Sequence, residues 1–220
     1  MREFRILACL LAATFVSACG TTPNAKNQVM PGPSTAAISE ILARDSGTPG
    51  QLSLVATLEH ELSIARLYAD YASRRPEDVR WIQTHLRHLR HSLDPSSERD
   101  GPGLGYGVVR AANNLGDQLG AIIGASAASQ PMREHARQAQ ASLENIVSWA
   151  NEILILSANA LTEPKLSPRL IDWLGVIKQR LAVMHSGVDA DRDQQISAKP
   201  REGGLVQART EFSHVLAGTK

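Results

Sequence analysis

Apolar residues recur at steps of three and four through most of this 220-residue chain, and this spacing constrains the fold more than any other feature. The repeat gives a helix one apolar face, whereas a half-buried strand requires alternation at every second residue. The clearest stripe is formed by Val79, Ile82, Leu86, Leu89 and Leu93. Sustained alternation and long β-branched runs are missing from the sequence, so we expect an all-α fold.

Prolines and glycines divide this pattern into helical segments. Helices are expected over residues 35–44, 51–73, 76–93, 108–129, 131–161 and 170–184. Pro76 and Pro131 are placed in first turns, where proline is tolerated. The sequence therefore predicts an antiparallel bundle of four to five helices, followed by an acidic loop and a short C-terminal helix that begins after Gly204.

Three glycines within the segment 108–129 stand four residues apart, at Gly116, Gly120 and Gly124. Glycine inside a helix costs about 1 kcal/mol of stability relative to alanine. A regular row of glycines therefore suggests that this face of the helix requires the smallest residue. In a membrane this spacing would favour helix dimerisation. Because Asp117 and several other polar residues share the segment, we interpret the row as a face on which another helix of the bundle packs closely.

The first nineteen residues have the parts of an export signal that ends at a cysteine. Residues 1–5 carry two arginines and one glutamate, and the apolar run 6–16 has eleven residues. A run of this length is too short to span a bilayer, which takes about 20 residues, but it suits a signal peptide. The sequence Val16-Ser17-Ala18-Cys19 then resembles the lipobox of bacterial lipoproteins.

This resemblance implies cleavage before Cys19 and a lipid anchor on its sulfur. The expected parts are a signal peptide (1–18), a lipidated tether (19–34), a helical bundle (35–186), and an acidic loop with a C-terminal helix (187–220). The protein would then lie in the cell envelope, facing the periplasm or the exterior. Gly20 after the cysteine is compatible with the outer membrane, where the organism has one.

Composition excludes several classes of function. Without the leader the chain has 21 basic and 21 acidic residues, and this balance argues against nucleic-acid binding, which requires a basic face. The two cysteines are Cys9, inside the leader, and Cys19, so thiolate metal sites and disulfides are not expected in the bundle. Motifs of nucleophile elbows, zinc proteases and phosphate loops are missing from the sequence, so we expect no enzyme. The glycine-rich stretch 101–107 is interpreted as a turn with Tyr106 as an aromatic plug.

The stretch Asp189 to Ser197 resembles the first half of an EF-hand calcium loop. Asp189, Asp191 and Asp193 stand at loop positions 1, 3 and 5, and Gln195 at position 7 would offer its backbone carbonyl. The second half departs from the pattern: position 6 is Gln194 instead of glycine, and position 12 is Pro200 instead of glutamate. Glu202 stands two residues later and could reach back.

These departures leave two alternatives for the acidic loop. It binds Ca²⁺ weakly, with a dissociation constant of about 10⁻⁴ to 10⁻³ M, or it is an empty acidic turn. The order of parts also resembles exported bacterial proteins with a helical domain, a DxDxD loop and a Glu-Gly-Gly-Leu segment, here Glu202 to Leu205. That likeness covers at most the last forty residues and implies no activity.

Histidines give a second candidate metal site. His85, His88 and His91 stand three residues apart, and His88 and His91 point away from the apolar stripe. With His60 from the preceding helix, they would bind a transition metal through neutral imidazoles. The alternative is a polar face, since arginines interleave with these histidines.

Three hypotheses follow for the function. The first is a lipid-anchored, non-enzymatic helical module that binds calcium or another metal and meets a partner in the envelope. The second is a structural or interaction module whose acidic loop is vestigial. The third is a transition-metal carrier that uses His60, His88 and His91.

Overall fold

The computed structural model describes residues 47–218. A short 3-10 turn, η1 (Pro49–Gln51), precedes six α-helices; these are α2 (Leu54–Ala72), α3 (Val79–Leu93), α4 (Val108–Gly124), α5 (Gln130–Thr162), α6 (Pro168–Ser186) and α7 (Leu205–Ala217). Residues 47–218 contain no strand, so the all-α prediction is confirmed. The predicted order is also confirmed, with five helices followed by the acidic loop and a C-terminal helix that begins at Leu205.

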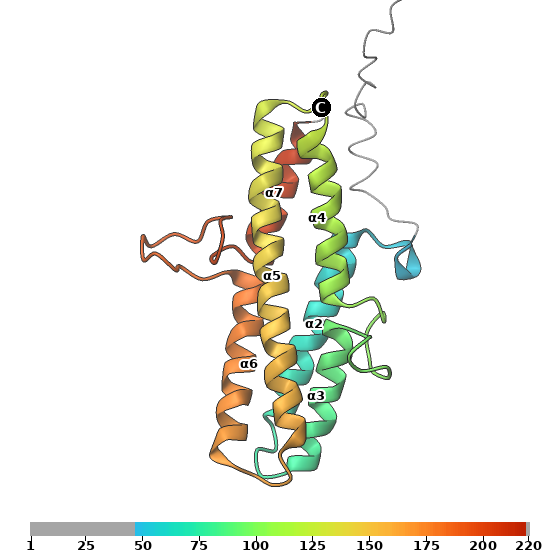
Figure 1. Ribbon diagram of the computed structural model, residues 1–220, viewed down its shortest axis with the longest axis vertical. Coiled ribbons are helices and arrows are strands. Elements are labelled where there is room, and N and C mark those ends of the chain that lie inside the picture. Colours follow the sequence, from blue (N-terminus) through green and yellow to red (C-terminus); the bar gives the residue numbers. More distant parts are fainter. Residues whose placement is uncertain (1–46, 219–220) are drawn as a thin grey trace, which may run out of the picture. The chain divides into compact units, whose positions relative to one another are not determined.

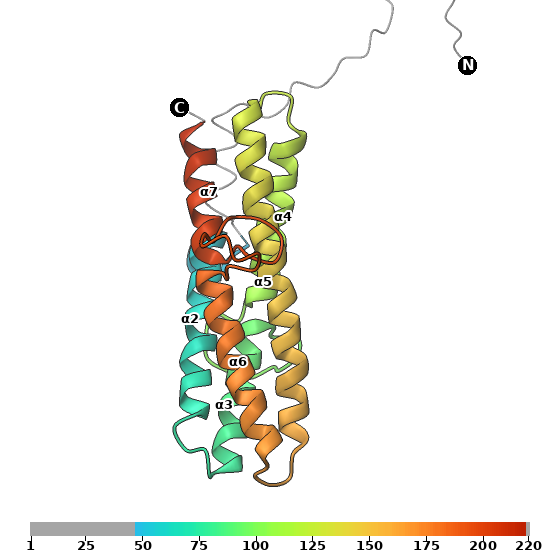
Figure 2. The same cartoon turned by 90° about the vertical axis from the view of Figure 1, so that its left-hand side faces the viewer.

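Helix α5 is the longest element, and every helix except α2 packs along it (Figures 1 and 2). Its 33 residues extend about 50 Å at 1.5 Å per residue. Helices α3 and α4, of 15 and 17 residues, follow one another along α5, and α6 and α7, of 19 and 13 residues, do the same. Each pair therefore matches the length of α5, and a loop interrupts each pair part-way.

Hydrogen bonds at both ends of α5 confirm this alignment. Gln83, in the first turns of α3, donates to the carbonyls of Leu161 and Glu163 at the C-terminal end of α5. Arg133, in the first turn of α5, donates to the carbonyl of Ala125, which follows α4. The two interruptions, residues 94–107 and 187–204, leave the bundle on opposite sides in Figure 1.

Side-chain caps set where most helices begin. Ser53, Asp78, Ser129 and Ser167 each accept a hydrogen bond from a backbone N–H of the first turn, which would otherwise lack a partner. The expectation that Pro76 opens a helix is wrong, because Asp78 caps α3 and the helix begins at Val79. Trp81 links the start of α3 to the end of α2, since its Nε1 donates a hydrogen bond to the carbonyl of Tyr71 at 2.7 Å.

One apolar core runs between the helices. The predicted stripe of α3 is inside it, with Ile82, Leu86, Leu89 and Leu93 fully buried. Helix α7 belongs to the same core through Leu205, Phe212 and Val215. Burial of this apolar surface is the main favourable contribution to folding.

The interpretation of the glycine row as a packing face is wrong. A Cβ added at Gly116, Gly120 or Gly124 would meet no atom within 4 Å, so these positions face open space. The buried face of α4 is formed by Ala111, Ala112, Leu115, Leu119 and Ile122. The row lies on another side of the helix because four-residue steps keep the glycines together but do not say which way they face.

Within residues 47–218, none of the helices combines the length and apolar character needed to cross a membrane. The predicted leader, Cys19, the tether and the helix over 35–44 lie outside the described residues.

Replacing Gly120 with alanine should raise the free energy of unfolding by about 0.5–1 kcal/mol, because the methyl group meets open space and alanine lowers the entropy cost of the helix. Urea denaturation measures this change. The matched control is Gly103→Ala, which should destabilise the protein because Gly103 has a φ of 116° and its Cβ would overlap Glu61. A destabilising Gly120→Ala would show that the face is covered.

Candidate metal centre

The acidic loop, residues 187–204, leaves the bundle through a narrow neck. Val188 N donates to the carbonyl of Glu202 at 2.9 Å, which joins the two arms of the loop. Gly187 has a φ of 76°, and a Cβ there would lie 2.6 Å from the same carbonyl oxygen. A Cβ at Gly204 would lie 2.7 Å from Gly187 N. A side chain at either position would collide with the backbone of the opposite arm, so the neck requires glycine at both Gly187 and Gly204.

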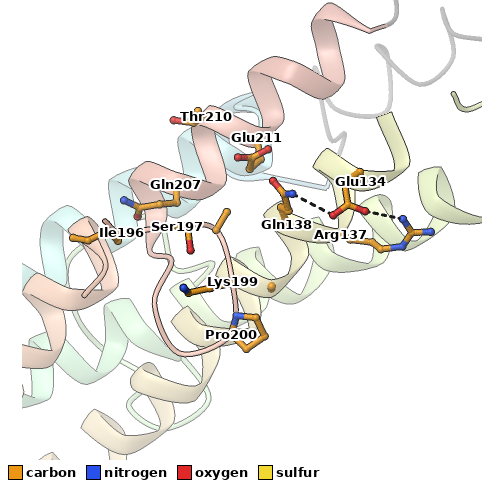
Figure 3. A pocket seen from close by; sticks show the side chains of 12 residues that line it. Glu134, Arg137, Gln138, Ile196, Ser197, Lys199, Pro200, Gln207, Thr210 and Glu211 are labelled. Atoms are coloured by element: carbon orange, nitrogen blue, oxygen red, sulfur yellow. Dashed lines mark hydrogen bonds and ion pairs between the residues drawn. The ribbon is translucent and has the colours of Figure 1, made fainter. Parts of the chain in front are cut away.

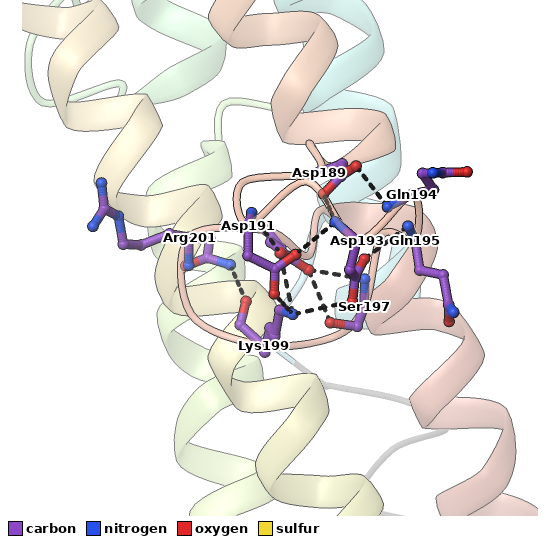
Figure 4. Close-up of polar contacts among 10 residues, drawn as sticks. Asp189, Asp191, Asp193, Gln194, Gln195, Ser197, Lys199 and Arg201 are labelled. Atoms are coloured by element: carbon purple, nitrogen blue, oxygen red, sulfur yellow. Dashed lines mark hydrogen bonds and ion pairs between the residues drawn. The ribbon is translucent and has the colours of Figure 1, made fainter.

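The first half of the loop is held by aspartate side chains that accept backbone hydrogen bonds (Figure 4). Asp189 accepts from Asp193 N at 3.2 Å and from Gln194 N at 3.0 Å, and Asp193 accepts from Gln195 N at 2.8 Å. Gln194, which stands where the EF-hand pattern has glycine, adopts a φ of 68°. A side chain in this conformation costs about 1–2 kcal/mol, so the turn forms without glycine but at a cost.

Glu202 reaches back into the loop, as predicted. Its side chain is 1 % exposed, and it accepts hydrogen bonds from Ser197 N at 3.2 Å and Ser197 Oγ at 2.9 Å. Carboxylate oxygens of Asp189, Asp191 and Glu202 lie within 4.8 Å of one another. The loop therefore forms an acidic cluster that could hold a metal ion. Asp193, the remaining predicted carboxylate ligand, is not part of this group. Gln195 was expected to contribute only its backbone carbonyl.

Lys199 places its ammonium among the same carboxylates (Figure 4). Its Nζ lies 2.5 Å from Asp191 Oδ2, 3.2 Å from Glu202 Oε1 and 3.9 Å from Asp193 Oδ2. The hydrogen bond from Lys199 lowers the pKa of Asp191, and the same contact raises the pKa of Lys199. Burial opposes ionisation of Glu202, but hydrogen bonds from Ser197 and Lys199 outweigh it and lower its pKa. All three groups are therefore charged at neutral pH, and the cluster already contains one cation.

Asn145, on α5, supports the second half of the loop. Its Nδ2 donates to the carbonyls of Lys199 at 2.9 Å and Gly203 at 3.0 Å, and its Oδ1 accepts from Arg201 N at 2.6 Å. Asn145 is 7 % exposed and thus a buried polar residue in the middle of α5. No motif in the sequence marks Lys199 or Asn145 as part of this site. A polar residue beside the apolar positions Leu143 and Ile146 was the available hint for Asn145.

An open groove of about 650 Å³ lies between α5, α7 and the acidic loop (Figure 3). Charged residues of both signs line it, with Glu134 and Arg137 from α5, Glu211 from α7 and Lys199 from the loop. Lys199 belongs to both the groove and the acidic cluster. Any change in the position of its ammonium therefore alters one wall of the groove.

The structure does not assemble His60, His88 and His91 into one site. Among residues 47–218, Asp189, Asp191 and Glu202 are the group of three or more candidate ligands close enough for one ion. His60 is exposed on α2, the ring of His88 packs edge-on against Tyr68 at 4.8 Å, and His91 Nδ1 lies 2.8 Å from the carbonyl oxygen of Glu98. Steps of three residues rotate each side chain by about 60° around α3, which sends these rings to different neighbours.

His85 lies inside an aromatic cluster instead. Its ring is 4.3 Å from Trp81 and 5.5 Å from Tyr71, measured between centroids. Both of its ring nitrogens are buried, and neither has a hydrogen-bond partner among residues 47–218. Burial lowers the pKa of His85, and the charges of His88, Arg74 and Arg75 lower it further. The neutral imidazole is therefore the form that the folded protein favours.

Comparison of the chain with protein-family models, curated proteins and solved structures found no match.

Acidification should destabilise the protein in part through His85. Its folded pKa lies below the ordinary value of 6.5, so the unfolded chain takes up the proton first and stability falls as the pH drops through and below 6.5. Replacing His85 with phenylalanine should make the loss of unfolding free energy between pH 7.5 and 5.5 smaller. Urea denaturation at both pH values measures it, and an unchanged pH dependence would contradict the prediction.

Proposed function

We propose that this chain is a non-enzymatic, calcium-binding helical module that is tethered to a bacterial membrane through lipid on Cys19. The observation that carries the calcium proposal is the return of Glu202, which brings a buried carboxylate from one end of the loop to Asp189 and Asp191 at the other. Hard oxygen ligands that converge from a short loop suit Ca²⁺, which takes six to eight oxygens.

The affinity of this site should be weak. Three carboxylates converge and Asp193 lies outside this group, so only part of the six to eight oxygens that Ca²⁺ takes is already in place. The ion must also displace the Lys199 ammonium from Asp191 and Glu202. Both costs support a dissociation constant of about 10⁻⁴ to 10⁻³ M.

A second candidate is a structural module in which Lys199 permanently takes the place of the ion. The three distances from its Nζ to carboxylate oxygens favour this alternative, because a tethered ammonium already neutralises part of the cluster. In both candidates a partner from the envelope would meet the groove, whose wall includes Lys199.

Calcium titration of three proteins separates the two candidates. The parent should bind Ca²⁺ weakly, Asp189→Ala should abolish binding, and Lys199→Met should raise the affinity about tenfold, because it keeps the length of the side chain but removes the competing charge. Isothermal titration calorimetry measures the affinity, and a tenfold change corresponds to about 1.4 kcal/mol.

The matched control for this titration is Lys178→Met, since Lys178 pairs with Asp70 on α2 at 3.0 Å and not with the loop. Its calcium affinity should equal that of the parent. If neither the parent nor Lys199→Met binds millimolar Ca²⁺, the calcium proposal fails and the structural module remains.

The anchor is tested separately in a bacterial host. The parent should incorporate labelled palmitate and sediment with membranes, whereas Cys19→Ser should do neither, because the thiol is the site of acylation. Equal membrane association of Cys19→Ser and the parent would contradict the lipoprotein proposal.

A further inference from the structure

We propose that a second cation site lies beneath the loop between α3 and α4, where Glu61 and His91 would bind a first-row divalent metal such as Zn²⁺. This site is far along the sequence from the acidic loop and shares none of its residues. The glycine loop, defined here as residues 101–107, covers it.

Glu61 is a fully buried carboxylate that is only half satisfied. It lies on α2 with 0 % exposure, and its Oε1 accepts hydrogen bonds from Tyr106 N at 2.8 Å and Gly107 N at 3.0 Å. Its Oε2 is buried and has no hydrogen-bond partner within the described part of the chain. A buried carboxylate oxygen without a donor or a cation is strongly unfavourable, so this oxygen points to a positively charged ligand.

His91 offers a nitrogen ligand from α3. It is 7 % exposed, and its Nδ1 lies 2.8 Å from the carbonyl oxygen of Glu98. A carbonyl oxygen only accepts, so Nδ1 carries the proton and, in the neutral ring, Nε2 keeps its lone pair. Metal-binding histidines are held in the same way, with the second ring nitrogen donating to a carbonyl or carboxylate.

The glycine loop brings these two groups to the same short turn. A Cβ at Gly103 would overlap Glu61 Oε2 and lie 3.6 Å from Ser92 Oγ, and a Cβ at Gly105 would lie 3.9 Å from His91 Nε2. The φ of Gly103 is 116°, which side chains rarely adopt. The backbone of the loop thus packs tightly against the carboxylate and lies beside the imidazole, and only Leu104 separates the two glycines that make these contacts.

The donor set indicates the class of ion. A neutral imidazole with a carboxylate suits Zn²⁺ and related first-row metals, whereas Ca²⁺ prefers oxygen ligands alone. Ser92 Oγ is a further oxygen beside Gly103, although it donates to the Pro102 carbonyl at 3.2 Å. The two sites therefore differ in chemistry: the acidic loop offers only oxygen, and the site beneath the glycine loop offers nitrogen and oxygen.

Zinc titration of the whole chain, with its two cysteines alkylated, tests this site. Glu61→Gln keeps an acceptor for Tyr106 N and Gly107 N but removes the charge, and His91→Asn keeps a donor near the Glu98 carbonyl but removes Nε2. Each variant should lower the Zn²⁺ affinity at least tenfold and remove the zinc-dependent rise in melting temperature. His60→Asn, on the exposed side of α2, is the matched control and should bind like the parent.

Asp189→Ala keeps the two sites apart in this experiment, because it removes a ligand of the acidic loop and should leave zinc binding unchanged. Zinc binding that is the same in the parent, Glu61→Gln and His91→Asn would overturn the proposal, as would no binding in the parent. Should a variant fail to fold, a crystal of the parent soaked in Zn²⁺ decides the question. An anomalous peak between Glu61 Oε2 and His91 Nε2 is expected, and its absence there would overturn the proposal.

Discussion

Two buried glutamates hold the chain at the places where the bundle is interrupted. Glu61 accepts backbone N–H groups where the glycine loop returns to α4, and Glu202 accepts Ser197 where the acidic loop returns to α7. A helix that stops in the middle of a bundle leaves backbone donors and acceptors without partners, and buried polar groups must be satisfied. The carboxylates satisfy part of this requirement, and the rest of each loop is arranged around them.

The two glutamates differ in how their charge is balanced. Lys199 lies 3.2 Å from Glu202 Oε1, so the acidic loop contains its own cation. Among residues 47–218, Glu61 Oε2 has no hydrogen-bond partner of any kind. The same architectural solution thus produces a cluster in which an ion must compete with lysine and a buried carboxylate oxygen beside which no such competitor is bonded. This difference bears on the affinity of the two proposed sites, whereas the metal that each suits follows from its donor atoms.

The helices were predictable because the relevant information is local. Apolar spacing and the capping residues Ser129 and Ser167 act within a few residues of the backbone that they stabilise, so α5 and α6 begin and end close to where the sequence predicts. The return of Glu202 was also predictable, since the EF-hand-like spacing left one carboxylate two residues late. The glycine row of α4 was misinterpreted because regular spacing defines a face but not what covers it. The three-histidine site failed for a related reason, since the residues that meet His88 and His91 come from α2 and from the following loop.

The sequence by itself determined the all-α class, the order of the helices and the acidic character of the C-terminal loop, because periodicity and turn residues act at short range. It also carries the prediction of lipid on Cys19, which depends on a short linear motif. Only the tertiary structure decided that Lys199 enters the acidic cluster, that Asn145 holds the loop against α5, and that Glu61 meets the glycine loop. Those contacts join residues that are up to 58 positions apart, and only the packing of the helices brings such residues together.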